Sequence, residues 1–375
     1  MASQVEMGGS FRVRPFRPAW WLRSAHAQTV GGKFLRPDPG ITLRRDRLET
    51  PDGDFLDLDI ATHPRDAARL RNDAHPPDAA RLGDDTHTPD DAHLPDDAHL
   101  PDDAPVALVL HGLEGSARRR YMLVTYRELL ARGLRPVGLN FRSCGGEPNR
   151  KPRFYHSGET DDLRFVLEHL AGRFPGVPIG AIGYSLGGNV LLKYLGERGD
   201  AAADHVRAAV AVSVPFDLAA GADALERGFM ARIYTEYFLR NLRKKVRAKT
   251  GLLRPHLDVE ATLAARTLRA FDDAATAPLH GFADSADYYR RASCGPFLER
   301  IRTPTLLIQA EDDPFVPPSS IPHDAIARNP HLISAISPGG GHVGFIHGTP
   351  WAPRFWAEEE AARFLATLLP PTADR

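Results

Sequence analysis

The chain has 375 residues and a formal net charge of −1, because 47 Lys and Arg residues nearly balance 48 Asp and Glu residues. This length fits one large α/β domain with an insertion or two ordinary domains, and the balanced charge argues against a nucleic-acid partner held by phosphate neutralisation. No stretch reaches the roughly 20 apolar residues of a spanning helix, and Cys144 and Cys294 form no disulfide framework, so we expect a soluble protein in a reducing, cytoplasmic setting.

The N-terminal region ends in a predicted hairpin. Its arginines alternate with prolines and no apolar segment follows them, which argues against a signal peptide. Residues 41–61 alternate polar and apolar side chains around the turn sequence PDGD, so we expect an antiparallel hairpin at the edge of a sheet. We treat residues 1–62 as an N-terminal extension that includes this hairpin.

Residues 63–105 differ in composition from the rest of the chain. They are dominated by Asp, Ala, Pro, Arg and His, and contain the consecutive units HTPDDA, HLPDDA and HLPDDA. Such a segment cannot bury enough apolar surface to offset its ordering entropy, so we interpret it as a disordered, low-complexity insert. The alternative is metal binding by histidines that carboxylates flank, but without rigid geometry we count no metal site; these histidines are His75, His87, His93 and His99.

From Val106 onwards, apolar strands alternate with amphipathic helices. This rhythm implies crossover connections and a mostly parallel sheet covered on both faces. A helix-rich, arginine-rich segment at 215–295 interrupts it, which we interpret as a helical lid between core segments 106–214 and 296–375. The predicted strands are 106–110, 136–140, 177–183, 207–213, 305–309 and 331–336, and the predicted helices are 121–132, 163–170, the stretch after 185, and 353–369.

The most informative motif is G-x-S-x-G at 183–187, between a short apolar run and a helix-like stretch. A serine on a tight strand-to-helix turn projects its hydroxyl outward, and glycines flank it because side chains there would collide with the neighbouring elements. The position of the motif therefore indicates a nucleophile elbow with Ser185 at its tip.

A serine hydroxyl needs a general base, and the base needs an orienting carboxylate. An acidic loop follows the strand at 305–309, and three glycines precede His342. We assign Ser185 as nucleophile, His342 as base and then acid, and Asp313 as the orienting carboxylate; this chain order is that of the α/β-hydrolases. The less favoured alternatives are Asp312 or Asp217 as the acid and His347 as the base.

Two backbone amides are candidates for the oxyanion hole that a tetrahedral intermediate needs. One is that of Leu113, in the loop HGLEG after the first central strand, and the other is that of Leu186, directly after the nucleophile. We interpret His111 as a structural residue hydrogen-bonded beneath this loop.

Apolar residues recur at helical spacing within the predicted lid. They either pack the lid onto the main domain or form an apolar wall for an acyl chain, and for the second role we select Phe229, Ile233 and Tyr237. The full set is Phe229, Met230, Ile233, Tyr237 and Phe238.

A basic run follows in the same segment. We interpret it as a solvated helix face, with attraction to anionic lipid headgroups as the alternative, so peripheral membrane contact stays open. We expect Trp20 and Trp21 to be core residues rather than an interfacial anchor. The basic run comprises Arg240, Arg243, Lys244, Lys245, Arg247 and Lys249.

Five stretches give the chain a resemblance to a known family. It resembles the YheT-like branch of the α/β-hydrolases, the AB hydrolase 4 family, which includes plant embryogenesis-associated proteins and animal abhydrolase-domain lipases and esterases. The family's triad maps onto Ser185, Asp313 and His342. The resemblance implies the α/β-hydrolase fold and carboxylic ester hydrolysis, with lipid esters cleaved by some relatives. The stretches are WWL at 20–22 with HAQTV at 26–30, HGLEGS at 111–116, NFR at 140–142 with GEPN at 146–149, YSLGGN at 184–189, and DDPF at 312–315 with GH at 341–342.

The chain departs from the family pattern in two places. It has RSCGG at 142–146 where relatives usually show a sequence like RGCSG, and it carries the repeat insert. Neither departure touches the predicted triad, so both bear on substrate contacts rather than on catalysis.

The sequence therefore predicts a serine hydrolase that cleaves a small-molecule carboxylic ester, lipid-like or with a short to medium acyl chain, through an acyl-enzyme on Ser185. An acyltransferase that uses the same acyl-enzyme and a non-catalytic binding protein are the alternatives. Serine at the elbow disfavours dehalogenase and epoxide-hydrolase chemistry, which use a carboxylate there. No phosphate loop or dinucleotide fingerprint is apparent, so no cofactor is expected.

Overall fold

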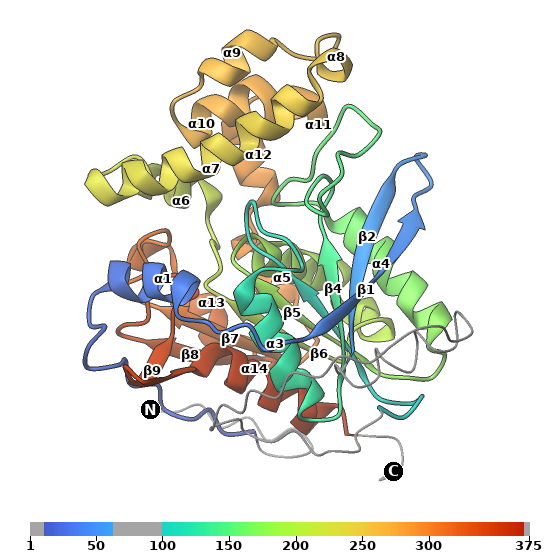
Figure 1. Ribbon diagram of the computed structural model, residues 1–375, viewed down its shortest axis with the longest axis vertical. Coiled ribbons are helices and arrows are strands. Elements are labelled where there is room, and N and C mark those ends of the chain that lie inside the picture. The colour runs from blue at the N-terminus through green and yellow to red at the C-terminus, as the bar shows by residue number, and fades with distance from the viewer. Residues whose placement is uncertain (1–10, 63–99, 371–375) are drawn as a thin grey trace, which may run out of the picture.

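A computed structural model describes residues 11–62 and 100–370 of the chain. Its centre is an eight-stranded sheet in the order β1-β2-β4-β3-β5-β6-β7-β8 (Figure 1). The pairs β1·β2 and β2·β4 are antiparallel and the other neighbours are parallel. The strands are β1 (Thr42–Glu49), β2 (Phe55–Thr62), β3 (Val106–Leu110), β4 (Arg135–Asn140), β5 (Ile179–Tyr184), β6 (Ala208–Val212), β7 (Thr305–Ala310) and β8 (Leu332–Ser337).

The predicted hairpin at 41–61 is present as β1 and β2, with β1 at the edge of the sheet. Arginines of β1 face acidic residues of β2: Arg45 binds Asp57 and Asp59, and Arg47 binds Asp57. These pairs stabilise an edge strand that buries little apolar surface. Most of the predicted insert, residues 63–99, lies outside the described residues, and so do the four histidines considered above as metal ligands.

Helices cover both faces of the sheet, as the strand–helix rhythm predicts. Alternate residues of β3 point to opposite faces. Val106, Leu108 and Leu110 pack in one buried cluster with α4 (Thr160–Arg173) and α5 (Leu186–Arg198). Ala107 and Val109 pack in the other cluster with α3 (Arg120–Leu130) and α14 (Trp356–Leu368). The central strands are thus buried on both faces, which explains their continuous apolar sequences.

The segment between β6 and β7, which we call the lid segment, is helical and lies above the sheet in Figure 1. It has a small core of its own, which includes Leu239, Val246 and Phe271. Its helices are α6 (Leu218–Ala224), α7 (Phe229–Ala248), α8 (Thr250–Leu253), α9 (Val259–Ala264), α10 (Leu268–Phe271), α11 (Ala277–His280) and α12 (Ser285–Ala292), with a π-helical turn at Asp272–Thr276.

The end of the chain differs from the prediction of one helix from residue 353. The structure has a hairpin of β9 (Ile346–Thr349) and β10 (Ala352–Phe355), and α14 begins only at Trp356. Pro353 is tolerated because it lies in a two-stranded ribbon, where a missing N–H costs little. The Trp356 amide donates to the Phe345 carbonyl at 3.0 Å, which fixes the hairpin against the loop that carries His342.

The N-terminal segment contains a helix that the sequence analysis did not predict, α1 (Ala25–Phe34), with the Ser24 hydroxyl as its N-cap. Trp21 is half-buried, and its indole N–H donates to the Gly348 carbonyl. Trp20 is 62% exposed, so the prediction that it belongs to the core is wrong.

The remaining elements are α13 (His323–Arg328) and 3₁₀ turns at Gly199–Asp204, Gly295–Arg300 and Pro318–Ser320. Within residues 11–62 and 100–370, no helix is both long and apolar enough to cross a membrane.

Candidate active site

The turn from β5 to α5 carries Ser185 in a strained conformation, with φ 53° and ψ −119°. A non-glycine residue in this region costs about 1–3 kcal/mol, which the surrounding structure must offset. The Ser185 amide donates to the Val212 carbonyl at 2.8 Å. A Cβ at Gly187 would lie 2.6 Å from the Leu110 carbonyl oxygen, and one at Gly183 would lie 2.5 Å from the Gly187 oxygen. The G-x-S-x-G glycines are therefore required by backbone contact.

Ser185, His342 and Asp313 lie within hydrogen-bonding distance of one another in series. Oγ of Ser185 is 2.9 Å from Nε2 of His342, and Nδ1 of His342 is 2.8 Å from Oδ2 of Asp313. The three residues follow β5, β7 and β8, so the carboxyl ends of parallel strands bring them to one edge of the sheet. The Asp313 side chain is fully buried and also accepts the Phe315 amide at 2.8 Å.

Two hydroxyl groups position the loop that carries His342. The backbone N–H of His342 donates to Oγ1 of Thr29 in α1 at 2.9 Å, and the N–H of Val343 donates to Oγ of Ser213 at 2.9 Å. The ring of Phe315 lies 4.3 Å from the imidazole ring. Thr29 was not predicted as a functional residue, although it lies in the stretch HAQTV that contributes to the family resemblance.

The alternative acids and base lie in other environments. Asp312 accepts the Gly341 amide at 2.8 Å, and burial raises the pKa of its carboxyl. Asp217 caps the N-terminus of α6 through the Ala219 and Ala220 amides. Nε2 of His347 is 3.9 Å from a carboxylate oxygen of Glu359. The structure therefore brings neither carboxylate nor this imidazole into the hydrogen-bonded series at Ser185.

The candidate oxyanion donors flank the nucleophile. Leu186 is the first residue of α5, so its amide has no acceptor within the helix. Leu113 lines the same cavities as Ser185, in a loop where Glu114 has a φ of 54°. His111 lies beneath this loop: Nδ1 donates to the Gly112 carbonyl at 2.8 Å and Nε2 accepts the Phe141 amide at 3.2 Å. Burial lowers the pKa of His111 to about 3, so this imidazole is neutral and serves as a structural bridge.

Two cavities meet at Ser185 and His342. The first, which we call the buried chamber, has a volume of about 130 Å³ and lies between the core and the lid segment, lined by side chains that include Leu113, Leu186, Leu218, Leu242, Phe271 and Tyr289. The second, the vestibule, is more open, has a volume of about 470 Å³ and lies between α1, the loop after β3 and α7, lined by side chains that include Thr29, Lys33, Phe34, Arg119, Ile233 and Tyr237. Mostly apolar walls with a few convergent polar groups are typical of small-molecule sites.

The three residues predicted to contact substrate do not all line these two cavities. Ile233 and Tyr237 line the vestibule. Phe229, the first residue of α7, is 77% exposed and lines neither cavity, so we do not retain it as a substrate contact. Phe238 lies against Phe315 and lines both cavities.

The basic run of α7 is only partly a solvated face. Arg240, Lys244 and Arg247 are exposed, as predicted. Lys245 instead points inward: its Nζ lies 2.7 Å from Oε1 of Glu114 and 3.0 Å from Sγ of Cys144. Arg243 donates to the Ala265 carbonyl at 2.7 Å, and Lys249 is buried among backbone carbonyls, with burial lowering its pKa to about 8. The prediction is wrong for these three residues, because α7 and the residue that follows it direct these side chains toward the core and the rest of the lid segment.

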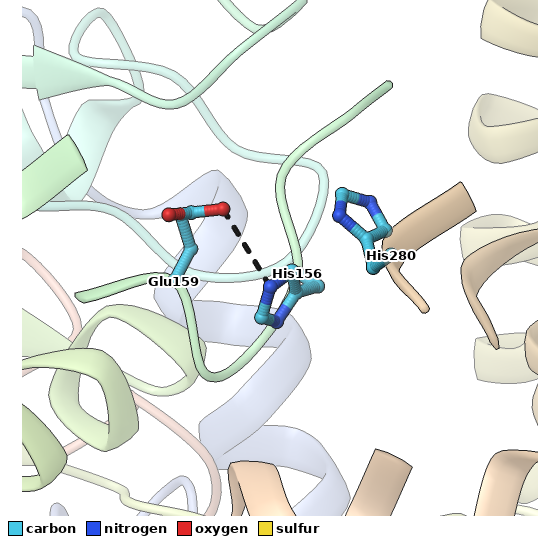
Figure 2. Close-up of side chains that lie close together, drawn as sticks. All are labelled: His156, Glu159 and His280. Carbon is cyan, nitrogen blue, oxygen red and sulfur yellow. Dashed lines mark ion pairs between the residues drawn. The ribbon is translucent and has the colours of Figure 1, made fainter. Parts of the chain in front are cut away.

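Figure 2 shows a cluster of potential metal ligands where the loop before α4 meets the lid segment. The ligand atoms of His156, Glu159 and His280 lie within 4.8 Å of one another, and imidazole and carboxylate donors suit Zn²⁺. Protein groups already use them: Arg153 and His156 share Oε2 of Glu159, and the Gly158 amide donates to Nδ1 of His156 at 3.1 Å. A metal ion bound to Nε2 of His156 would require Nδ1 to carry the proton and donate a hydrogen bond, whereas Nδ1 accepts one here. We therefore interpret the cluster as a contact between core and lid segment.

Comparisons with known proteins agree with this architecture. A family model described as alpha/beta hydrolase fold matches residues 105–349. YheT of Escherichia coli (strain K12), named as a candidate esterase, is 37% identical over 358 residues, which are 94% of each chain. Phospholipase ABHD3 of Mus musculus is 28% identical, over 89% of this chain and 74% of its own. Monoacylglycerol lipase of Saccharomyces cerevisiae is 32% identical, over 70% of this chain and 59% of its own.

The same fold occurs among solved structures. The esterase Pf2001 of Pyrococcus furiosus superimposes with a TM-score of 0.51 and 14% sequence identity, over 96% of this chain and 100% of that one, which supports the fold alone. The predicted fold class and family resemblance are confirmed. The chain belongs to the α/β-hydrolase fold family, in the esterase- and lipase-type branch that contains YheT.

Proposed function

We propose that the protein hydrolyses carboxylic esters through an acyl-enzyme on Ser185. The observation that carries this proposal is the hydrogen-bonded series Ser185 Oγ, His342 Nε2, His342 Nδ1 and Asp313 Oδ2, with separations of 2.9 and 2.8 Å. Serine alone is a weak nucleophile, and a base at this distance with an oriented ring is what activates it.

In the first half of the reaction, Oγ of Ser185 attacks the ester carbonyl while Nε2 of His342 removes the hydroxyl proton. Asp313 holds the proton on Nδ1, so that Nε2 is free to accept, and stabilises the imidazolium that forms. The amides of Leu113 and Leu186 donate to the developing oxyanion. The imidazolium then protonates the oxygen of the departing alcohol, and the acyl group stays on Ser185.

In the second half, water occupies the place of the alcohol. His342 removes a proton from the water, hydroxide attacks the acyl carbonyl, and the same imidazolium returns the proton to Ser185 as the acid leaves. The roles of the two amides are unchanged, because an oxyanion of the same geometry forms twice.

The proposed substrates are lipid-like esters or esters with a short to medium acyl chain. The buried chamber supports this class, because its walls are mainly aliphatic and aromatic and it begins at Ser185. The names of two relatives, a phospholipase and a monoacylglycerol lipase, support the same class. A cytoplasmic setting is part of the proposal, supported by Cys144 and Cys294, which are both free thiols.

The test is covalent labelling combined with turnover. A fluorophosphonate probe should label the protein at Ser185, and 4-nitrophenyl esters of graded acyl length should be hydrolysed. Ser185→Ala should abolish both signals, whereas Ser319→Ala, which changes an exposed serine far along the chain, should preserve them. Addition of a simple alcohol separates hydrolysis from acyl transfer through the ratio of acid to new ester. Labelling at any other residue, or turnover that survives Ser185→Ala, would refute the proposal.

A further inference from the structure

The vestibule is the more open of the two cavities that meet at the catalytic serine. Besides Ser185 and His342, it is lined by Val343 and Thr29, which flank His342 in the chain and in space. The leaving-group oxygen must receive its proton from Nε2 of His342, so it lies on the His342 side of Ser185. The acyl group remains on Ser185 while the alcohol leaves and water enters. The more open cavity therefore suits the alcohol part, and the buried chamber suits the acyl part.

Most charged side chains that line the vestibule are paired with an opposite charge. Arg36 binds Glu358 at 2.6 Å, Arg120 binds Asp38 at 2.8 Å, and Glu114 binds Lys245 at 2.7 Å. These three lining groups therefore bring no uncompensated charge to the cavity.

Lys33 and Arg119 are different. Among the residues that the structure describes, neither has a carboxylate oxygen within 4.0 Å. Lys33 is exposed at the end of α1 and Arg119 is half-buried at the start of α3. Two cations without counter-charges thus line a cavity that opens on Ser185.

Both cations are gathered around Tyr237 of α7. Nζ of Lys33 lies 4.3 Å from the centre of the tyrosine ring, and Nη2 of Arg119 lies 3.3 Å from its hydroxyl oxygen. Nη2 of Arg119 also donates to the Glu114 carbonyl at 2.7 Å, next to the candidate oxyanion donor Leu113. The guanidinium is therefore held beside the loop of the candidate oxyanion donor, and the exposed ammonium lines the same cavity.

We propose that the vestibule selects esters whose alcohol part carries an anionic group, a phosphate or a carboxylate, with Lys33 and Arg119 as its counter-charges. The proposal rests on the proposed ester hydrolysis at Ser185 and specifies its substrate. A partly desolvated cavity strengthens such pairing relative to bulk water, and a planar guanidinium matches either anion. The apolar walls formed by Phe34, Ile233 and Tyr237 provide contact for the carbon skeleton of the alcohol, so Ile233 and Tyr237 contact this part and not the acyl chain for which the sequence selected them.

Two pairs of substrates test the selectivity. Hexanoyl esters of 4-hydroxybenzoate and 4-hydroxybenzamide differ in the charge of the alcohol part, and hexanoyl glycerol 3-phosphate and hexanoyl glycerol make the same comparison for phosphate. We expect kcat/KM for the anionic member to exceed that for the neutral member by about tenfold at low ionic strength, and the ratio to fall as salt is added. If the ratio is high in only one pair, that pair identifies whether the vestibule recognises phosphate or carboxylate.

Lys33→Gln and Arg119→Gln should each lower the ratio of anionic to neutral kcat/KM, and the double variant should bring it close to 1. Arg247→Gln removes an exposed cation of α7 that lines neither cavity, and should leave the ratio unchanged. Because Arg119 also contacts the loop of Leu113, the ratio is the decisive quantity and Lys33→Gln is the cleaner variant.

A second measurement does not depend on turnover. Free 4-hydroxybenzoate should slow fluorophosphonate labelling of Ser185 more than 4-hydroxybenzamide does. Lys33→Gln should reduce this difference, and the double variant with Arg119→Gln should remove it. Ratios near 1 in both substrate pairs, or ratios unaffected by the variants, overturn the anionic selectivity while leaving ester hydrolysis intact. If no ester is hydrolysed in a way that depends on Ser185 but the labelling difference is still observed, the proposed hydrolysis is contradicted and the charge selectivity of the cavity is not.

Discussion

The sheet core and the lid segment are organised differently around the same site. Ser185, Asp313 and His342 all come from loops of the core, where buried strands on both sides hold the backbone in place. The lid segment consists of helices with a small core of their own, and it joins the core through contacts such as Lys245 with Glu114 and Phe238 with Phe315. Reacting atoms thus lie on loops that the buried sheet positions, whereas walls that contact substrate also come from a separate helical segment.

The largest expected effect lies in the core, at the carboxylate behind His342. Asp313→Asn should keep the packing but no longer hold the proton on Nδ1, and the corresponding change in a serine protease triad lowers kcat about 10⁴-fold. Asp312→Asn is the matched control, because a carboxamide oxygen can still accept the Gly341 amide. Steady-state kinetics on a nitrophenyl ester distinguishes the two, and equal losses in both variants would contradict the assignment of Asp313.

The next effect concerns the contact between lid segment and core. Lys245→Met would leave the Glu114 carboxylate, which is 2% exposed, without its cation. Removal of one partner of a buried ion pair costs about 3–5 kcal/mol of stability. We expect a lower free energy of unfolding in urea and faster hydrogen exchange in α7. The double variant Lys245→Met with Glu114→Gln should recover most of the loss. If the double variant is as unstable as the single one, the ion pair is not the main contact.

A third prediction uses Asp272 of the lid segment. Burial raises the pKa of Asp272 to about 6, although Thr276 and Tyr289 donate to it. The folded state therefore binds this proton more tightly than the unfolded state, so stability falls as pH rises from about 4 to about 6, by at most about 3 kcal/mol. Asp272→Asn should flatten this pH dependence, measured by urea unfolding at pH 4.5, 5.5 and 7. Parallel curves for both proteins would show that the carboxyl is not the cause.

The smallest expected effect is at Thr29, where the N-terminal segment supports the core. Thr29→Val removes the acceptor of the His342 amide, a hydrogen bond worth about 1 kcal/mol, so kcat should fall about fivefold. Thr29→Ser keeps the hydroxyl and should retain most of the activity. If Thr29→Val raised KM and left kcat unchanged, Thr29 would be a substrate contact rather than a support of the histidine.

Much of the core could be predicted because its signals are local. Short apolar runs, the G-x-S-x-G turn and the spacing of Leu163, Val166, Leu167 and Leu170 each describe one element, and all four of these side chains are fully buried. Prediction was weaker where local pattern and tertiary contact disagree. Residues 352–355 join a hairpin although they precede a helix, and Lys245 is turned inward although it lies in a run of cations.

The sequence by itself determined the order of the central strands and of the helices between them, the tight serine turn, and a short set of triad candidates that contains Ser185, Asp313 and His342. Each of these is encoded by neighbouring residues or by a loop at a strand end. Only the tertiary structure decided that Asp313 rather than Asp312 faces His342, that Thr29 supports the histidine across 313 residues, and that two cavities meet at Ser185. These depend on side chains distant in the chain, and no local pattern specifies which of them meet.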